Sequence, residues 1–120
     1  MQSYKDLEIY QLAHPLAIEI HKMSLKLPSF EMYEEGSQIR KSSKAISSNI
    51  AEGFGRKRYR QDYIKFLVYA HSSCSETIEH LELIYKTDSL KDKKQFDYFM
   101  ENYDKLGRKL NKFIDAVEKG

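Results

Sequence analysis

The strongest constraint on the fold is a run of apolar residues, recurring in steps of three and four, over residues 63–84. Such steps place the side chains on one face of an α-helix. We predict a helix over about residues 59–87, roughly 40 Å long at 1.5 Å rise per residue, and only another long helix can cover its apolar face. That face consists of Tyr63, Phe66, Ala70, Cys74, Thr77, Leu81 and Ile84.

Three more helices are predicted from the same kind of pattern. One covers about residues 3–26 and ends before Pro28, one covers about residues 37–52, and the last runs from near Phe96 to the C-terminus. Four helices joined by short connections are typical of an antiparallel up-and-down bundle. We therefore predict an all-α, antiparallel four-helix bundle, with residues 1–120 forming a single domain.

Single residues predict where these helices begin, bend and end. Ser37 is expected to cap the second helix, and Asp88 or Ser89 the last one, because their side chains can accept hydrogen bonds from free amides. Gly53 is expected to adopt the left-handed conformation that ends a helix, which would place the next turn at residues 53–55. Pro15 lies inside the first predicted helix, where its missing amide donor should produce a kink.

Composition and motifs argue against several classes of protein. The longest apolar run, residues 66–70, is far shorter than the ~20 residues of a membrane span, so we expect no membrane association and a cytoplasmic location. Cys74 is the single cysteine and has no disulfide partner. His71, Glu76 and His80 lie near it, but no second motif completes a metal site or an activated nucleophile. We predict a protein that is not an enzyme and has no metal or cofactor.

Cations are concentrated in one part of the chain. Residues 40–65 contain eight Lys and Arg residues and two acidic residues, a net charge of +6, although the whole chain has a net charge of +2. Arginines on a turn can contact phosphates, and a neighbouring ring can stack on a base. A solvated turn that places cations near a helix C-terminus accounts for the same pattern. The candidate nucleic-acid contacts are Arg40, Lys41, Lys44, Arg56, Lys57, Arg58, Tyr59 and Arg60.

Several apolar residues lie outside the faces that form the predicted core. In a monomeric bundle they would be exposed, and their number on two helices favours self-association, although scattered exposed apolar residues are common. The candidate interface residues are Ile18, Leu25, Ile64, Val68 and Tyr69.

Four short segments have a distinctive order of residues: QIRK at 38–41, SNIAEG at 48–53, GR at 55–56 and FL at 66–67. Together with YKDLE at 4–8, they resemble the four-helix bundle proteins encoded in intervening sequences of bacterial 23S ribosomal RNA genes. The resemblance covers essentially the whole chain. It departs from the family pattern at Lys41, Ser72 and Pro15, where the family commonly has Arg, Gly and a helix-compatible polar residue.

This resemblance implies a ring-shaped homopentamer. A similar fold belongs to the accessory protein of diversity-generating retroelements, a basic pentamer that binds nucleic acid and a reverse transcriptase. By analogy, we expect the basic residues between Arg40 and Arg60 to contact phosphates of RNA or DNA. The alternative is a scaffold that binds a protein partner and has no nucleic-acid role. Salt dependence separates the two, because phosphate contacts weaken steeply with added salt.

Four residues of these segments are expected to have structural roles. Asn49 and Glu52 are polar residues near the end of the second predicted helix, and Gly53 and Gly55 follow them. Asn49 is expected to satisfy buried backbone or Arg groups. Glu52 is expected to pair with Arg56 or with a neighbouring subunit, and so to position the basic segment.

Overall fold

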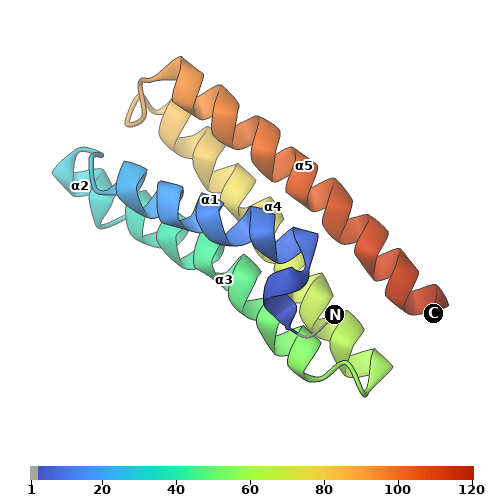
Figure 1. Cartoon of the computed structure of the whole chain (residues 1–120). Coiled ribbons are helices and arrows are strands. Elements are labelled where there is room, and N and C mark those ends of the chain that lie inside the picture. Colours follow the sequence, from blue (N-terminus) through green and yellow to red (C-terminus); the bar gives the residue numbers. More distant parts are fainter. Residues whose placement is uncertain (1–2) are drawn as a thin grey trace.

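The computed structural model describes residues 3–120, which form only helices and their connections (Figure 1). Four long helices run alternately up and down the bundle, as Figure 1 shows, and the predicted antiparallel four-helix bundle is confirmed. A short 3-10 helix, η1, comes before the first long helix, and a single helical turn, α2, lies in the first connection. The elements are η1 (Tyr4–Asp6), α1 (Glu8–Ser24), α2 (Ser29–Met32), α3 (Glu35–Gly55), α4 (Arg60–Lys86) and α5 (Lys93–Lys119).

The helices pack in the order in which they follow one another. α1 packs on α3, α3 on α4, and α4 on α5, while a smaller contact between α1 and α5 closes the bundle. α1 and α4 therefore occupy diagonal corners. The bundle measures 45 × 22 × 20 Å. The connection between α3 and α4 lies at the same end as η1 and the C-terminus, and α2 lies at the opposite end (Figure 1).

The core follows the predicted apolar faces closely. On α4, six of the seven predicted positions are buried, and Leu67 takes the place predicted for Phe66. Both residues fit a three-and-four step between Tyr63 and Ala70, so the spacing alone does not choose between them. Phe66 is half-buried beside the core. The five predicted positions of the second helix, Ile39, Ser43, Ile46, Ser47 and Ile50, are all buried.

The start of α3 differs from the prediction. The helix begins at Glu35, and Ser37 is an exposed residue inside it rather than its cap. The buried carboxylate of Glu31 has the capping role instead, because it accepts a hydrogen bond from the Glu35 amide at 3.4 Å. Its other oxygen accepts from the Ser89 hydroxyl at 2.6 Å. A residue of the previous connection thus caps α3 and links it to the connection before α5.

The other predicted ends need two corrections. Gly53 is a buried residue inside α3, which continues to Gly55, and no glycine among residues 3–120 has a positive φ. Asp92 caps α5 by accepting from the Gln95 amide at 3.1 Å, so the predicted caps Asp88 and Ser89 are wrong. Asp88 instead has a φ of 66°, which turns the chain between α4 and α5.

The beginning of the first helix also lies later than predicted. Ser3 caps η1 and not a long helix, because its hydroxyl accepts from the Lys5 amide at 3.1 Å. Leu7 is extended, and α1 starts at Glu8 and continues past Pro15 to Ser24. Within the described range, no helix is long and apolar enough to cross a membrane.

Candidate nucleic-acid interface

The connection between α3 and α4 is a tight turn of four residues, 56–59. α3 ends at Gly55, and the Tyr59 amide donates to the Arg56 carbonyl at 2.9 Å, which closes the turn. Tyr59 then precedes the first residue of α4 in an extended conformation. Because both flanking helices end here, the side chains of residues 56–60 are all exposed at one end of the bundle.

Arg56 holds the two ends of this turn together. Its Nε donates to Oε2 of Glu52 at 2.8 Å, and its Nη1 lies 3.6 Å from Oδ2 of Asp62 on α4. The guanidinium also lies 4.9 Å from the centre of the Phe66 ring. The hydrogen bond to Glu52 and the two nearby carboxylates raise the pKa of Arg56. The pairing of Glu52 with Arg56 that the sequence suggested is therefore present.

The remaining cations of the turn, counting with them Arg60 at the start of α4, have no acidic partner. Lys57, Arg58 and Arg60 form no ion pair with any residue that the structure describes, and both nearby carboxylates are occupied by Arg56. The Lys57 ammonium lies 4.0 Å from the centre of the Phe54 ring. Tyr59 is 62% exposed. The turn therefore presents three cations and a phenol ring to solvent.

A cavity of about 440 Å³ lies against the turn. Its walls come from the last residues of α3, the turn itself and the first turn of α4. The lining residues are Phe54, Gly55, Arg56, Lys57, Arg58, Tyr59 and Asp62. Cations, a tyrosine ring and a hollow surface thus occur together at this turn.

The other predicted contacts lie elsewhere on α3. Arg40 is sixteen residues before Arg56, about 24 Å along the helix. Its guanidinium donates to the Ser24 hydroxyl at 2.9 Å and to the Met32 carbonyl at 3.0 Å, so it ties α3 to α1 and α2. Lys41 and Lys44 are exposed on the outer face of α3. The structure thus brings the residues of the turn together and separates Arg40 from them.

Four exposed polar residues of α3 share one face of the helix. Lys41, Lys44, Ser48 and Glu52 follow one another in steps of three and four, and all are exposed. They therefore form one stripe on α3 that leads toward Arg56. Helical spacing alone could have identified this stripe. Asn49 lies beside it and is half-buried.

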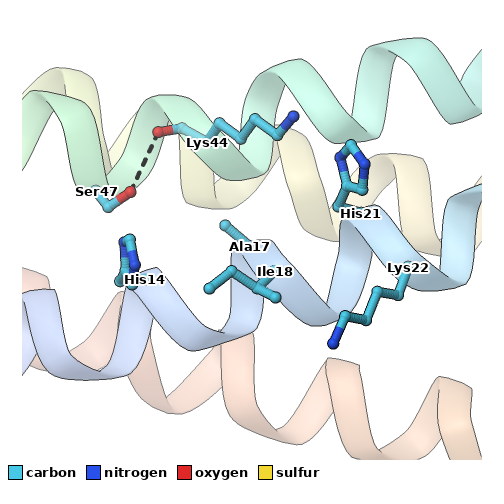
Figure 2. A pocket seen from close by; sticks show the side chains of 7 residues that line it. All are labelled: His14, Ala17, Ile18, His21, Lys22, Lys44 and Ser47. Atoms are coloured by element: carbon cyan, nitrogen blue, oxygen red, sulfur yellow. Dashed lines mark hydrogen bonds between the residues drawn. The ribbon is translucent and has the colours of Figure 1, made fainter.

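A second hollow, of about 360 Å³, lies between α1 and α3 (Figure 2). Figure 2 shows His14, Ala17 and His21 on the side of α1 toward Lys44 and Ser47 of α3, while Lys22 extends away from α3. The Ser47 hydroxyl donates to the Lys44 carbonyl at 3.3 Å. One predicted interface residue and one predicted phosphate contact, Ile18 and Lys44, thus line the same hollow.

The predicted interface residues fall on two separate surfaces. Ile18 and Leu25 are about half exposed on α1, and Val68 and Tyr69 are nearly as exposed on α4. Ile64 is partly buried. Because α1 and α4 are diagonal in the bundle, the two apolar surfaces face in different directions. The predicted interface residues therefore form an α1 patch and an α4 patch at two opposite corners, while other apolar side chains such as Phe30, Tyr33 and Tyr98 are exposed elsewhere.

Two potential metal ligands on α4, Cys74 and His80, contact other helices of the bundle. The Cys74 thiol is buried and donates to the Tyr103 carbonyl at 3.3 Å. Burial, with a smaller effect of the Asp104 carboxylate, raises the pKa of Cys74 to about 12. His80 lies with Nδ1 2.5 Å from Oε2 of Glu35 and joins α4 to α3. Across residues 3–120, no three His, Cys, Asp or Glu side chains are placed to hold a metal ion.

Comparison with known proteins identifies a family and solved structures with a similar fold. Residues 5–112 match the model of the 23S rRNA-intervening sequence protein family. The fold is similar to a crystal structure of a protein with unknown function from the S23 ribosomal protein family of Bacteroides thetaiotaomicron. The two chains are 22% identical with a TM-score of 0.78 over 89% of this chain and 95% of the other. No curated protein matches this chain. Since the family model spans most of the sequence, the chain belongs to the 23S rRNA-intervening sequence protein family.

Proposed function

We propose that this protein is a non-catalytic, homo-oligomeric helical bundle that binds nucleic acid through the turn between α3 and α4. One observation carries the proposal. Lys57, Arg58 and Arg60 are exposed on that turn without an acidic partner among the described residues, while Arg56 occupies both neighbouring carboxylates. Unpaired cations held on a fixed turn are suited to phosphate groups, which they can contact without first breaking an internal ion pair.

Phosphate binding by this turn is an electrostatic interaction. Each Lys or Arg that neutralises a phosphate releases a counterion. The logarithm of the binding constant therefore falls linearly with the logarithm of the salt concentration. Three cations from one subunit give only a weak interaction. Several copies joined in one assembly raise the apparent affinity, because the second and later contacts form at a high effective concentration.

The two apolar patches support an oligomer of a particular kind. A patch on α1 that contacts a different patch, on α4, of the next copy makes a heterologous contact, which closes into a ring if the rotation between copies allows it. In any closed ring, all copies of the α3–α4 turn lie at one level along the symmetry axis. Such an assembly presents a band of repeated cations, in agreement with the pentamer that the family resemblance implies.

The hollow between α1 and α3 favours a second function, a scaffold for a protein partner. Ile18 lines this hollow and is 46% exposed, so an apolar side chain of another protein could bury it. In this case the turn between α3 and α4 would serve solubility alone. Binding to such a partner should change little with salt, since apolar contacts are not screened.

Fluorescence anisotropy of labelled RNA and DNA at several salt concentrations tests the first function. We expect binding at low salt that weakens steeply at physiological salt. The variant Arg58→Gln/Arg60→Gln removes two cations of the turn, and its salt slope should fall by at least about 1.4 on the logarithmic scale.

Lys91→Gln/Lys94→Gln is the matched control. It removes the same charge from exposed residues at the opposite end of the bundle. The proposal fails if no nucleic acid binds at low salt, or if the two double variants lose equal affinity. Equal loss would show that only net charge matters.

A further inference from the structure

We propose that the cavity beside the α3–α4 turn accepts one unpaired nucleotide, so that the protein prefers single-stranded RNA or DNA to a duplex. This inference rests on the proposed function and adds the class of nucleic acid. It places the base on the ring of Tyr59 and the phosphate on the neighbouring cations. Three features of the turn support it.

The first feature is a free aromatic face. Tyr59 is 62% exposed, and its ring makes no ring or cation contact with any residue in the range 3–120. Phe54 lines the same cavity, but the Lys57 ammonium covers its ring at 4.0 Å. Bases inside a duplex already stack on both faces, so a free ring at the surface can stack on an unpaired base but not on a base in the interior of a duplex. Tyr59 is therefore the residue that can distinguish the two forms.

The second feature is the size and charge of the cavity. Its volume of about 440 Å³ lies within the range of small-molecule sites. Arg56, Lys57 and Arg58 line it, so a phosphate would meet cations from three consecutive residues. The one carboxylate in the lining belongs to Asp62, whose Oδ2 lies 3.6 Å from Nη1 of Arg56. The three cations of the lining therefore outnumber its single carboxylate, and a nucleotide meets a ring and a net positive charge.

The third feature is the shape of this end of the bundle. Proteins that recognise duplex DNA in the major groove insert a helix or a β-ribbon into a groove about 12 Å wide. Here the turn lies between the ends of two helices, on a bundle 22 Å by 20 Å across. A turn joined to two helices packed side by side is broader than a single helix, so it does not enter this groove as one recognition helix does. A flexible single strand can instead bend over the turn and continue past Lys44 and Lys41 on α3.

Binding of three fluorescein-labelled probes of about 20 nucleotides, the length of a few single-strand sites, tests the inference. The probes are oligo-rU, oligo-dT and an rU·rA duplex, measured at one low salt concentration. We expect both single strands to bind at least about tenfold more tightly than the duplex. Tyr59→Ala should weaken single-strand binding about tenfold and leave duplex binding and the salt slope unchanged. Tyr59→Phe keeps the ring and should bind like the wild type.

Tyr33→Ala is the matched control, since Tyr33 is also an exposed tyrosine but lies beside α2 at the opposite end of the bundle. It should bind all three probes like the wild type, and both alanine variants should keep the wild-type melting temperature. Equal binding of duplex and single strands, with no effect of Tyr59→Ala, overturns this inference. The proposed function would still stand if Arg58→Gln/Arg60→Gln weakened that binding. Absence of binding to every probe overturns both.

Discussion

Gly53 shows how the same residue type can end a helix or allow two helices to meet. The sequence around it predicted a left-handed helix end, because glycine has no Cβ to clash there. In the structure it lies inside α3, where an added Cβ would be 3.1 Å from the Cβ of Phe66 and 3.3 Å from the ring of Tyr63. Close packing against α4 therefore explains this glycine. The sequence of α3 alone does not contain that contact.

Gly53→Ala should lower the free energy of unfolding by up to about 2 kcal/mol. The Cβ of Phe66 is fixed to the backbone of α4, so the helices must move apart, and overpacking of this kind costs about 1–3 kcal/mol. The better helix propensity of alanine returns about 1 kcal/mol of this cost. Gly55→Ala is the control, since no atom lies within 4 Å of its added Cβ. Urea denaturation that finds Gly53→Ala as stable as Gly55→Ala would contradict the close packing.

Cys74 predicts a loss of stability at alkaline pH. Burial raises the pKa of its thiol to about 12, whereas the thiol in the unfolded chain titrates near 9. The folded state therefore keeps a proton that the unfolded state has lost. Below pH 9 the thiol is protonated in both states and the free energy of unfolding does not depend on it. Between pH 9 and pH 12 the thiol lowers the free energy of unfolding by about 1.4 kcal/mol per pH unit. Burial also raises the pKa of Tyr63 and Tyr103, which adds to the same trend.

Melting temperature measured from pH 8 to pH 11 checks this alkaline effect. Cys74→Ala should have a shallower fall with pH than the wild type, whatever its stability at pH 8. Parallel curves for the two proteins would show that the thiol does not contribute. The comparison uses slopes, because the smaller side chain also leaves a cavity that changes stability at every pH.

Arg40 marks the limit of what charge counting can predict about the site. The sequence placed it with the cations of the turn because they lie within one segment of net charge +6. Its guanidinium instead bonds the Ser24 hydroxyl and the Met32 carbonyl, which belong to other elements. By contrast, Lys57, Arg58 and Arg60 were correctly grouped, since neighbours on a four-residue turn must be close in space. The sequence could predict that the cations near the turn lie together, but it could not predict that Arg40 bonds to α1 and α2.

At the scale of the elements, the apolar periodicity predicted four helices, and their ends were the part it missed. The predicted caps of α3 and α5 were wrong because the actual caps depend on how the connections between helices fold. Glu31 caps α3 and is itself held by Ser89, fifty-eight residues away. Asp92 caps α5 after a turn that only the positive φ of Asp88 makes possible. Such partners are set by how the helices meet at the end of the bundle.

Pro15→Ala should raise the free energy of unfolding by about 1–3 kcal/mol. Pro15 is exposed inside α1, and it has no amide to donate to the carbonyl one turn before. An alanine restores that hydrogen bond without losing core contacts. Pro28→Ala is the comparison, because Pro28 comes just before α2 and should not gain stability. Chemical denaturation that finds Pro15→Ala less stable than the wild type would show that α1 needs the interruption.

At the scale of the whole molecule, packing order was predictable and assembly is a proposal. Short connections dictated that consecutive helices be neighbours, and this is the order observed. The sequence also indicated surplus apolar residues. It did not show that they divide into a patch on α1 and a patch on α4, because the diagonal placement of these helices is a property of the closed bundle.

Charge introduced into either patch should break the proposed ring. In a heterologous contact the two patches are halves of one interface, so Ile18→Asp alone and Val68→Asp alone should each yield monomers. Tyr33→Asp, at an exposed tyrosine that is not among the predicted interface residues, should assemble like the wild type. Light scattering coupled to gel filtration gives the mass of each variant. An oligomer that survives both single substitutions would rule out contact between these two patches.

Sedimentation velocity of the protein with labelled oligo-rU, at low and at physiological salt, tests most directly whether this family member binds nucleic acid as an oligomer. We predict that the probe sediments with an oligomer of the protein at low salt and is released as salt increases, because several copies of the turn contact its phosphates. A probe that remains free at low salt, beside a protein that is itself oligomeric, would contradict the proposal. The α3–α4 turn would then be a solvated connection, and a scaffold for a protein partner would become the leading function.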